Sequence, residues 1–74
     1  MSPALADVPL RRVVEGLKRA GFDHVRTKGS HAVYRNDMGN VVVVPQHNTI
    51  KRGTLSSILR QAGLTVSEFQ KLLS

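Results

Sequence analysis

The 74-residue chain contains no cysteine. This absence excludes disulfides, cysteine-based zinc sites and thiol nucleophiles. Aromatic residues are scarce, with one tyrosine, two phenylalanines and no tryptophan. No stretch approaches the roughly 20 apolar residues of a transmembrane helix, and no apolar segment after a positively charged start marks a secretory signal. We therefore expect a cytoplasmic protein with no membrane partner.

Acidic residues are also few, with five Asp and Glu against eleven Lys and Arg and a formal net charge of +6. A domain this basic is a candidate for binding a polyanion, nucleic acid first. The alternative is a basic surface that only keeps the protein in solution. With three histidines and no repeated ligand spacing, the sequence offers little for a metal site, and we expect no metal and no cofactor.

A chain of this length makes one small domain, which we expect to span residues 1–74 with residues 1–6 disordered. A chain of this size buries only about 60% of the surface that its unfolded form exposes. The core is therefore thin and leaves no room for a deep enclosed pocket. Any chemistry must occur on the surface or in a shallow groove.

Apolar residues at helical spacing predict two longer helices. The first is capped by Asp7, has Pro9 in its first turn and ends at Gly21. The second is capped by Thr54 and ends at Gly63. A capping box in the sequence TVSE, with a threonine and a glutamate three residues apart, then begins a short C-terminal helix.

The segment between the two longer helices predicts three strands, at residues 24–28, 31–36 and 41–45. Tight turns join them, the second with the sequence DMGN. Four consecutive valines indicate that the third strand is covered at least partly on both faces, or is central. The order α-β-β-β-α with a short final helix predicts an α+β fold, with helices on one face of a three-stranded antiparallel sheet. The other face stays open, and a polyanion can lie there.

Two motifs occur in fixed order in this short chain. The first is KGSHAVYRN, in which Gly29-Ser30-His31 is followed three residues later by Tyr34, and the second is KRGTLSSILRQAGLTVSEFQKLL. Together with the sequence GF after the first helix and the valine strand, they resemble the HicA (YcfA-like) toxin family. The resemblance covers residues from about 13 to 73. It implies a fold similar to a double-stranded-RNA-binding domain. It also implies a type II toxin, an endoribonuclease that cleaves messenger RNA and stops growth, neutralised by a HicB-type antitoxin.

The resemblance implies that His31 is catalytic. A neutral imidazole near a ribose 2′-OH takes its proton, and the oxygen then attacks the adjacent phosphate. The products are a 2′,3′-cyclic phosphate and a 5′-OH, and the reaction needs neither a metal nor a covalent protein intermediate. Apart from the resemblance, a lone histidine at the start of a strand is more often structural or solvated.

Several residues are candidates for contacting the RNA. Lys28 is the candidate for stabilising charge on the phosphate, and cations beside His31 favour its neutral form. Backbone amides at the start of the second helix, beside two basic residues, are a further phosphate site. Tyr34 either stacks on a base or covers the sheet, and His47 is either a general acid or a loop residue. The full RNA-binding set is Lys28, Gly29, Ser30, Tyr34, Arg35, His47, Lys51, Arg52 and Thr54.

Two other functions fit the same sequence. One is a non-catalytic module that binds double-stranded RNA through the same fold and basic face. The other is an interaction subunit whose basic face binds an acidic protein. Binding in a DNA major groove ranks lower, because a sheet separates the two longer helices and leaves no helix-turn-helix.

Overall fold

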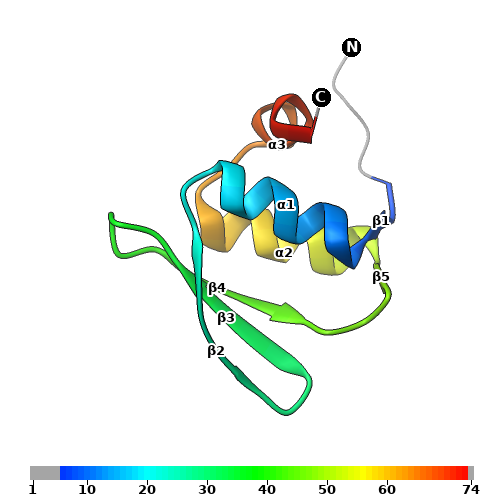
Figure 1. Ribbon diagram of the computed structural model, residues 1–74. Helices are drawn as coiled ribbons and strands as arrows, with labels where there is room; N and C mark the ends of the chain where they lie inside the picture. The colour runs from blue at the N-terminus through cyan, green and yellow to red at the C-terminus, as the bar shows by residue number, and fades with distance from the viewer. Residues whose placement is uncertain (1–5, 74) are drawn as a thin grey trace.

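The computed structural model describes residues 6–73, so residues 1–5 of the segment expected to be disordered lie outside the described residues. The described chain has the expected α+β architecture (Figure 1). In chain order its elements are β1 (Val8–Pro9), α1 (Leu10–Arg19), β2 (Asp23–Lys28), β3 (His31–Arg35), β4 (Val41–Pro45), β5 (Thr49–Ile50), α2 (Arg52–Ala62) and α3 (Val66–Leu73).

The main sheet is antiparallel with the strand order β2-β3-β4, and the helices lie on one side of it (Figure 1). The prediction of a fold similar to a double-stranded-RNA-binding domain is therefore confirmed. A second, two-stranded sheet pairs β1 with β5. This pairing brings the segment before α1 next to the segment before α2. Neither β1 nor β5 is predicted from the sequence, because two residues are too few for a periodic pattern.

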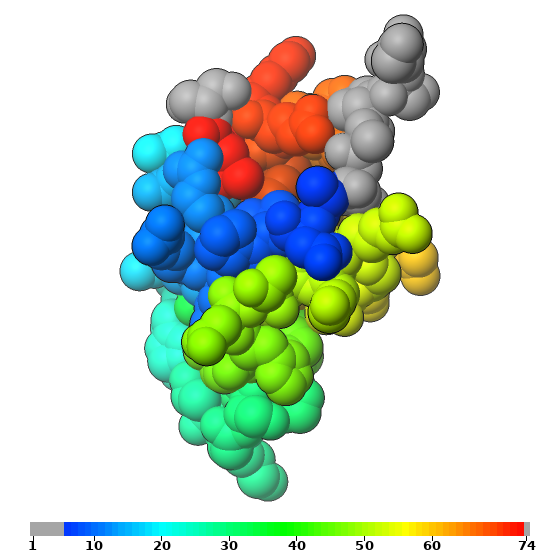
Figure 2. Space-filling view, turned by 90° about the vertical axis from the view of Figure 1, so that its right-hand side faces the viewer, coloured from blue at the N-terminus to red at the C-terminus, as the bar shows by residue number. Residues whose placement is uncertain are grey.

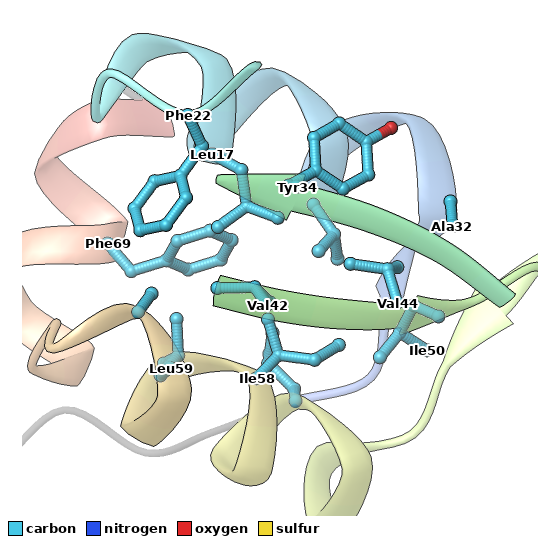
Figure 3. Close-up of a cluster of buried hydrophobic side chains, with 13 residues drawn as sticks. Leu17, Phe22, Ala32, Tyr34, Val42, Val44, Ile50, Ile58, Leu59 and Phe69 are labelled. Atoms are coloured by element: carbon cyan, nitrogen blue, oxygen red, sulfur yellow. The ribbon is translucent and has the colours of Figure 1, made fainter. Parts of the chain in front are cut away.

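Strand alternation decides which side chains enter the core. Ala32 and Tyr34 of β3, and Val42 and Val44 of β4, face the helices and are at most 5% exposed. They pack against buried residues of all three helices and of the segments beside them (Figure 3). These partners are Val13, Leu17, Phe22, Ile50, Leu55, Ile58, Leu59, Ala62 and Phe69.

The helices cover the valine strand on one face only, and the strand lies at the edge of the sheet. The expectation that it is covered at least partly on both faces, or is central, is therefore wrong. Val41 and Val43 are 46% and 38% exposed, while their neighbours in the strand are fully buried. The three helices all lie on the side of Val42 and Val44. A run of four identical side chains carries no period that distinguishes the two faces.

Both longer helices end at the predicted glycines. Gly21 has a φ of +93°, and Phe22 N–H donates to the carbonyl of Leu17 (2.9 Å). Gly63 has a φ of +72°, and the following Leu64 makes the equivalent bond to the second helix. These left-handed positions favour glycine because it lacks Cβ, and the bonds satisfy carbonyls that would otherwise have no partner at the helix ends.

The predicted N-terminal caps of the two longer helices are wrong. Asp7 caps α2 rather than α1, since its Oδ1 accepts a hydrogen bond from the backbone N–H of Arg52 (2.9 Å). The β1–β5 pairing explains this, because it carries Asp7 to the start of α2. Thr54 lies inside the first turn of α2, which begins two residues earlier. Leu10, the first residue of α1, donates its N–H to the carbonyl of Asn48 (2.9 Å).

The capping box that begins α3 is confirmed in both directions. Thr65 N–H donates to Glu68 Oε1 (2.9 Å), and Glu68 N–H donates to Thr65 Oγ1 (3.1 Å). The backbone hydrogen bond from Thr65, followed by the bond with its side chain, lowers the pKa of Glu68 below its ordinary value. The carboxylate of α3 is thus held in its charged form at the end of the helix where the dipole favours negative charge.

Two arginines of α1 hold the far end of α3. Arg12 Nη2 donates to the carbonyl of Leu73 (2.8 Å), and Arg19 Nη1 donates to the carbonyl of Leu72 (2.6 Å). Glu15 pairs with both arginines, at 2.7 and 3.6 Å. These half-exposed ion pairs contribute little by themselves. They orient the guanidinium groups toward carbonyls that the helix leaves without partners.

Candidate functional site

His31 is the first residue of β3 and follows a two-residue turn. Gly29 has a φ of +58° and no other residue of this turn has a positive φ, which is the pattern of a type II′ turn. Lys28, on the other side of the turn, is the cross-strand partner of His31. Side chains of directly opposite residues lie on the same face, with Cβ atoms about 4.5–5.5 Å apart. The turn therefore places an ammonium beside the imidazole.

The face of the sheet that carries His31 is the one that the helices leave open. Ala32 and Tyr34 point toward the helices, so His31, Val33 and Arg35 point the other way. The register adds Arg26 to this face, opposite Val33. The open face thus has cations on β2 and β3, the half-buried Val33 between them, and the exposed valines of the edge strand β4 on the other side. His31 stands at one end of this face.

The end of β4 supports the turn from the other side. Pro45 is the partner of His31 on β4, and the next N–H, of Gln46, donates to the carbonyl of Ser30 (2.6 Å). Val43 N–H turns away from β3 and donates to Gln61 Oε1 of α2 (2.9 Å). Pro45, two residues on, has its nitrogen on this same outer side. Its missing N–H therefore costs no bond of the ladder. The backbone on both sides of His31 is fixed.

The loop after β4 and the start of α2 lie on the same side of the molecule as this turn. Figure 2 faces that side, with the loop that contains His47 in the centre, the β2–β3 turn below it and the start of α2 to its right. His47, Lys51 and Arg52 are exposed. The first amide of α2 already has the Asp7 carboxylate as its acceptor. No local pattern in the sequence indicates this competing anion, because Asp7 lies 45 residues away in the chain.

Tyr34 belongs to the core rather than to the open face of the sheet. It is 5% exposed and lies on the helix side of the sheet, opposite to His31. Its ring meets the ring of His24 edge to face, with centroids 5.4 Å apart, and burial raises its pKa. Of the two interpretations of Tyr34, the structure supports the one in which its side chain covers the helix side of the sheet. Residues three apart in a strand point to opposite faces, a signal that the sequence already contained.

The remaining histidine, His24, is engaged away from the open face. Its Nε2 lies 2.7 Å from Thr27 Oγ1, across an irregularity in the β2–β3 register. His31 is an exposed imidazole with a lysine opposite it, while His24 has both a hydroxyl and a ring as neighbours. Among residues 6–73 no group of three or more His, Asp or Glu side chains is placed to hold a metal ion.

Comparison with known proteins identifies the family of the chain. Residues 10–64 match the family model for the HicA toxin of bacterial toxin–antitoxin systems. The chain belongs to the HicA toxin family. A search of the curated proteins finds no match. Membership makes this protein the toxin of a toxin–antitoxin system, with an antitoxin as its partner.

The segment shared with the HicA toxin family contains α1, the three-stranded sheet and α2. His31, its turn and the loop after β4 all lie within it. Helix α3, which begins at Val66, lies beyond the match. Within the described part of this HicA-family toxin, no helix has the length and apolar character required to cross a membrane.

Proposed function

We propose that this HicA-family toxin is an endoribonuclease that cleaves messenger RNA without a metal ion and thereby stops translation and growth. The observation that carries the proposal is the placement of His31, exposed on the open face with Lys28 directly opposite. A ribose supplies the nucleophile, so the protein has to supply a base, charge stabilisation and a surface that holds the strand.

His31 acts as the general base. Its neutral imidazole takes the proton of the 2′-OH, the oxygen attacks the adjacent phosphorus, and the bond to the 5′-oxygen of the next nucleotide breaks. Proton transfer of this kind contributes about 10²–10⁴-fold to a rate. The type II′ turn and the bond from Gln46 N–H to Ser30 hold the backbone of the base in place. Position matters here because misplacement of a catalytic group by about 1 Å can cost 10²-fold.

Lys28 stabilises the negative charge that develops on the phosphate oxygens. It is the cross-strand neighbour of His31 and is exposed, so a phosphate above the open face meets both groups. Arg26 and Arg35 extend the positive charge along β2 and β3, and Arg26, nearer to Lys28, binds a neighbouring phosphate. Gly29 has no side chain and Ser30 has a small one, so this turn leaves room for the RNA to approach His31.

The start of α2 binds the RNA farther from the cleaved bond. Lys51 and Arg52 are exposed there, beside the first turn that contains Thr54, on the side of the molecule that also carries the β2–β3 turn (Figure 2). His47 lies on the loop between β4 and β5 and is the candidate for protonating the leaving 5′-oxygen. Asp7 reduces the positive potential at this helix start, so these side chains, rather than the helix amides, carry the contact.

A HicB-type antitoxin neutralises the toxin in the cytoplasm. The combination of exposed valines and cations on the open face suits a partner surface with apolar and acidic residues. Such a partner would compete with RNA for the same groups.

The three histidines of the chain provide a matched test. The purified protein and its His31→Ala, His24→Ala and His47→Ala variants are incubated with one defined RNA in EDTA, and each is induced in cells without antitoxin. We expect His31→Ala to lose at least 10²-fold in cleavage rate and to permit growth. We expect His24→Ala, on the opposite face, to cleave at the unmodified rate. Loss of activity in His24→Ala alone, with His31→Ala active, would overturn the assignment.

A further inference from the structure

A hollow of about 330 Å³ lies at the end of the main sheet that is farther from the β2–β3 turn. Its volume falls at the lower end of the ~300–1,000 Å³ typical of small-molecule sites. The start of β2, the end of β3 and the β3–β4 turn form its walls. The lining residues are Asp23, Val25, Arg35, Asn36, Asp37 and Gly39. None of these except Arg35 has a role in the proposed function.

The hollow opens on the same face as His31. Arg35 and His31 share a face of β3 because the residues between them alternate, and Asp23 is the cross-strand partner of Arg35. The two β3 residues are four positions apart, which is roughly 13 Å along an extended strand. An RNA strand cut at His31 therefore reaches the hollow within a few nucleotides.

The charges of the hollow select the chemistry of its occupant. Asp23 and Asp37 disfavour a phosphate group, and Arg35 disfavours a cationic side chain of a protein partner. Among residues 6–73 the ion pairs are those of Glu15 with two arginines of α1. The carboxylates and the guanidinium of the hollow are thus available to a ligand. A neutral group that presents N–H donors and acceptors side by side satisfies both, and a nucleobase is such a group.

We propose that this hollow binds a guanine base of the RNA, a few nucleotides from the cleaved bond; this inference rests on the proposed ribonuclease function. Guanine has two neighbouring donors, N1–H and the N2 amino group, which match the two oxygens of a carboxylate. Its O6 and N7 acceptors match the donor fork of arginine. The other three bases lack two adjacent donors on one edge. Val25, with 52% of its surface exposed, offers an apolar contact to the ring.

The wall formed by the β3–β4 turn is held in place by its own hydrogen bonds. Asn40 N–H donates to Asn36 Oδ1 (2.8 Å), and Gly39 N–H donates to the carbonyl of Asn36 (3.2 Å). Asn36 therefore fixes the shape of the hollow, while Asp37 beside it remains free to accept from a base. Recognition of unstacked bases through their edges is the usual way in which proteins read single-stranded RNA.

The test uses RNAs that contain a single guanine, moved one position at a time through a guanine-free sequence. We expect the cut to move with the guanine at a constant offset. Replacing the guanine by inosine, which lacks the N2 amino group, should reduce cleavage by about 5- to 150-fold, the range for loss of one bidentate pair. One of Asp23 and Asp37 accepts the hydrogen bonds of the base. In the variant that replaces this residue by asparagine, the ratio of the cleavage rates of guanine RNA and inosine RNA should approach one. Each ratio is measured within a single protein, so a general loss of activity does not change it.

Binding by the His31→Ala variant separates this inference from the proposed function. Affinities of that variant for guanine and inosine RNAs are compared by fluorescence anisotropy. A preference for guanine with no cleavage by the unmodified protein would support the hollow and overturn the ribonuclease. Equal affinities, together with cuts that do not follow the guanine, would overturn the hollow. Loss of antitoxin binding in Asp23→Asn and Asp37→Asn with an unchanged guanine-to-inosine ratio would also overturn it, and would assign the hollow to the protein partner.

Discussion

Replacement of Gly16 by alanine tests how closely α1 and α3 approach each other. A Cβ built at Gly16 lies 2.5 Å from Phe69 Cε1 and 3.2 Å from two further atoms of the same ring. Phe69 is 2% exposed, so its ring cannot move out into solvent. Forcing an extra methyl group into a packed core costs about 1–3 kcal/mol.

The substitution also stabilises the helix, and this gain has to be subtracted from the cost of the clash. Alanine is more favourable than glycine in a helix interior by about 1 kcal/mol. The net effect of Gly16→Ala is therefore a loss of about 0–2 kcal/mol, or up to roughly 16 °C in Tm for a domain of this size. Gly53→Ala is the matched control, since Gly53 lies in α2 and a Cβ there meets no atom within 4 Å. We expect it to gain helix propensity without a clash, and therefore to be more stable than Gly16→Ala.

Thermal and urea unfolding, followed by circular dichroism, compare the two variants. If α3 packs closely on α1, Gly16→Ala unfolds at a lower temperature than Gly53→Ala. Phe69→Leu should also recover part of the loss when combined with Gly16→Ala, because the shorter side chain removes the clashing ring edge. Contacting pairs typically couple by about 0.5–3 kcal/mol. Equal or greater stability of Gly16→Ala relative to Gly53→Ala would refute the close packing of α3 on α1.

Three further predictions concern the ends of elements. Asp7→Ala should lose about 0.5–2 kcal/mol of unfolding free energy, and Asp7→Asn, which keeps an acceptor for Arg52 N–H, should lose less; equal losses would contradict the cap. Thr65 lowers the pKa of Glu68. The contribution of the ionised Glu68 side chain to the unfolding free energy is therefore complete above the ordinary glutamate pKa and is lost as the pH falls through the lowered pKa. Urea unfolding over a pH series should show this slope in the unmodified protein and not in Glu68→Gln. Gly29→Ala should cost about 1–2 kcal/mol for its left-handed backbone and slow RNA cleavage, and an unchanged protein would contradict the type II′ turn.

Local signals in the sequence predicted a large part of the fold. The capping box, the glycines that end α1 and α2, and the turns between the strands all depend on residues within a few positions of each other. Their chemistry requires particular residue types, such as glycine where φ is positive. The three-stranded sheet with helices on one face follows from the order of these elements.

Long-range pairings could not be predicted in the same way. Asp7 has the residue type and position to cap the helix that follows it, yet the β1–β5 ladder carries it to α2. The arginines of α1 look like solubilising charges in the sequence, and only the docking of α3 provides their carbonyl partners. In each case the partner is set by tertiary packing that no local pattern encodes.

The candidate site was predictable around His31 and less so elsewhere. The short motif at the turn indicated Lys28 and His31 together, and the register places them opposite each other. Tyr34, which the sequence left open between stacking on a base and covering the sheet, lies on the face opposite to His31, as the strand period of two implies. The hollow at the other end of the sheet depends on the approach of β2 and the β3–β4 turn, which the sequence alone does not show.

The most direct test of the account is the chemistry of the RNA ends produced by the unmodified protein and by His31→Ala in EDTA, at protein concentrations where both bind the RNA equally. The account predicts a 2′,3′-cyclic phosphate and a 5′-OH from the unmodified protein, and no product above background from His31→Ala. It also predicts that a single 2′-deoxy sugar at the cleaved position abolishes the reaction. Equal cleavage by both proteins, or cleavage of the deoxy-substituted RNA at the same position, would contradict His31 as the base that activates the 2′-OH.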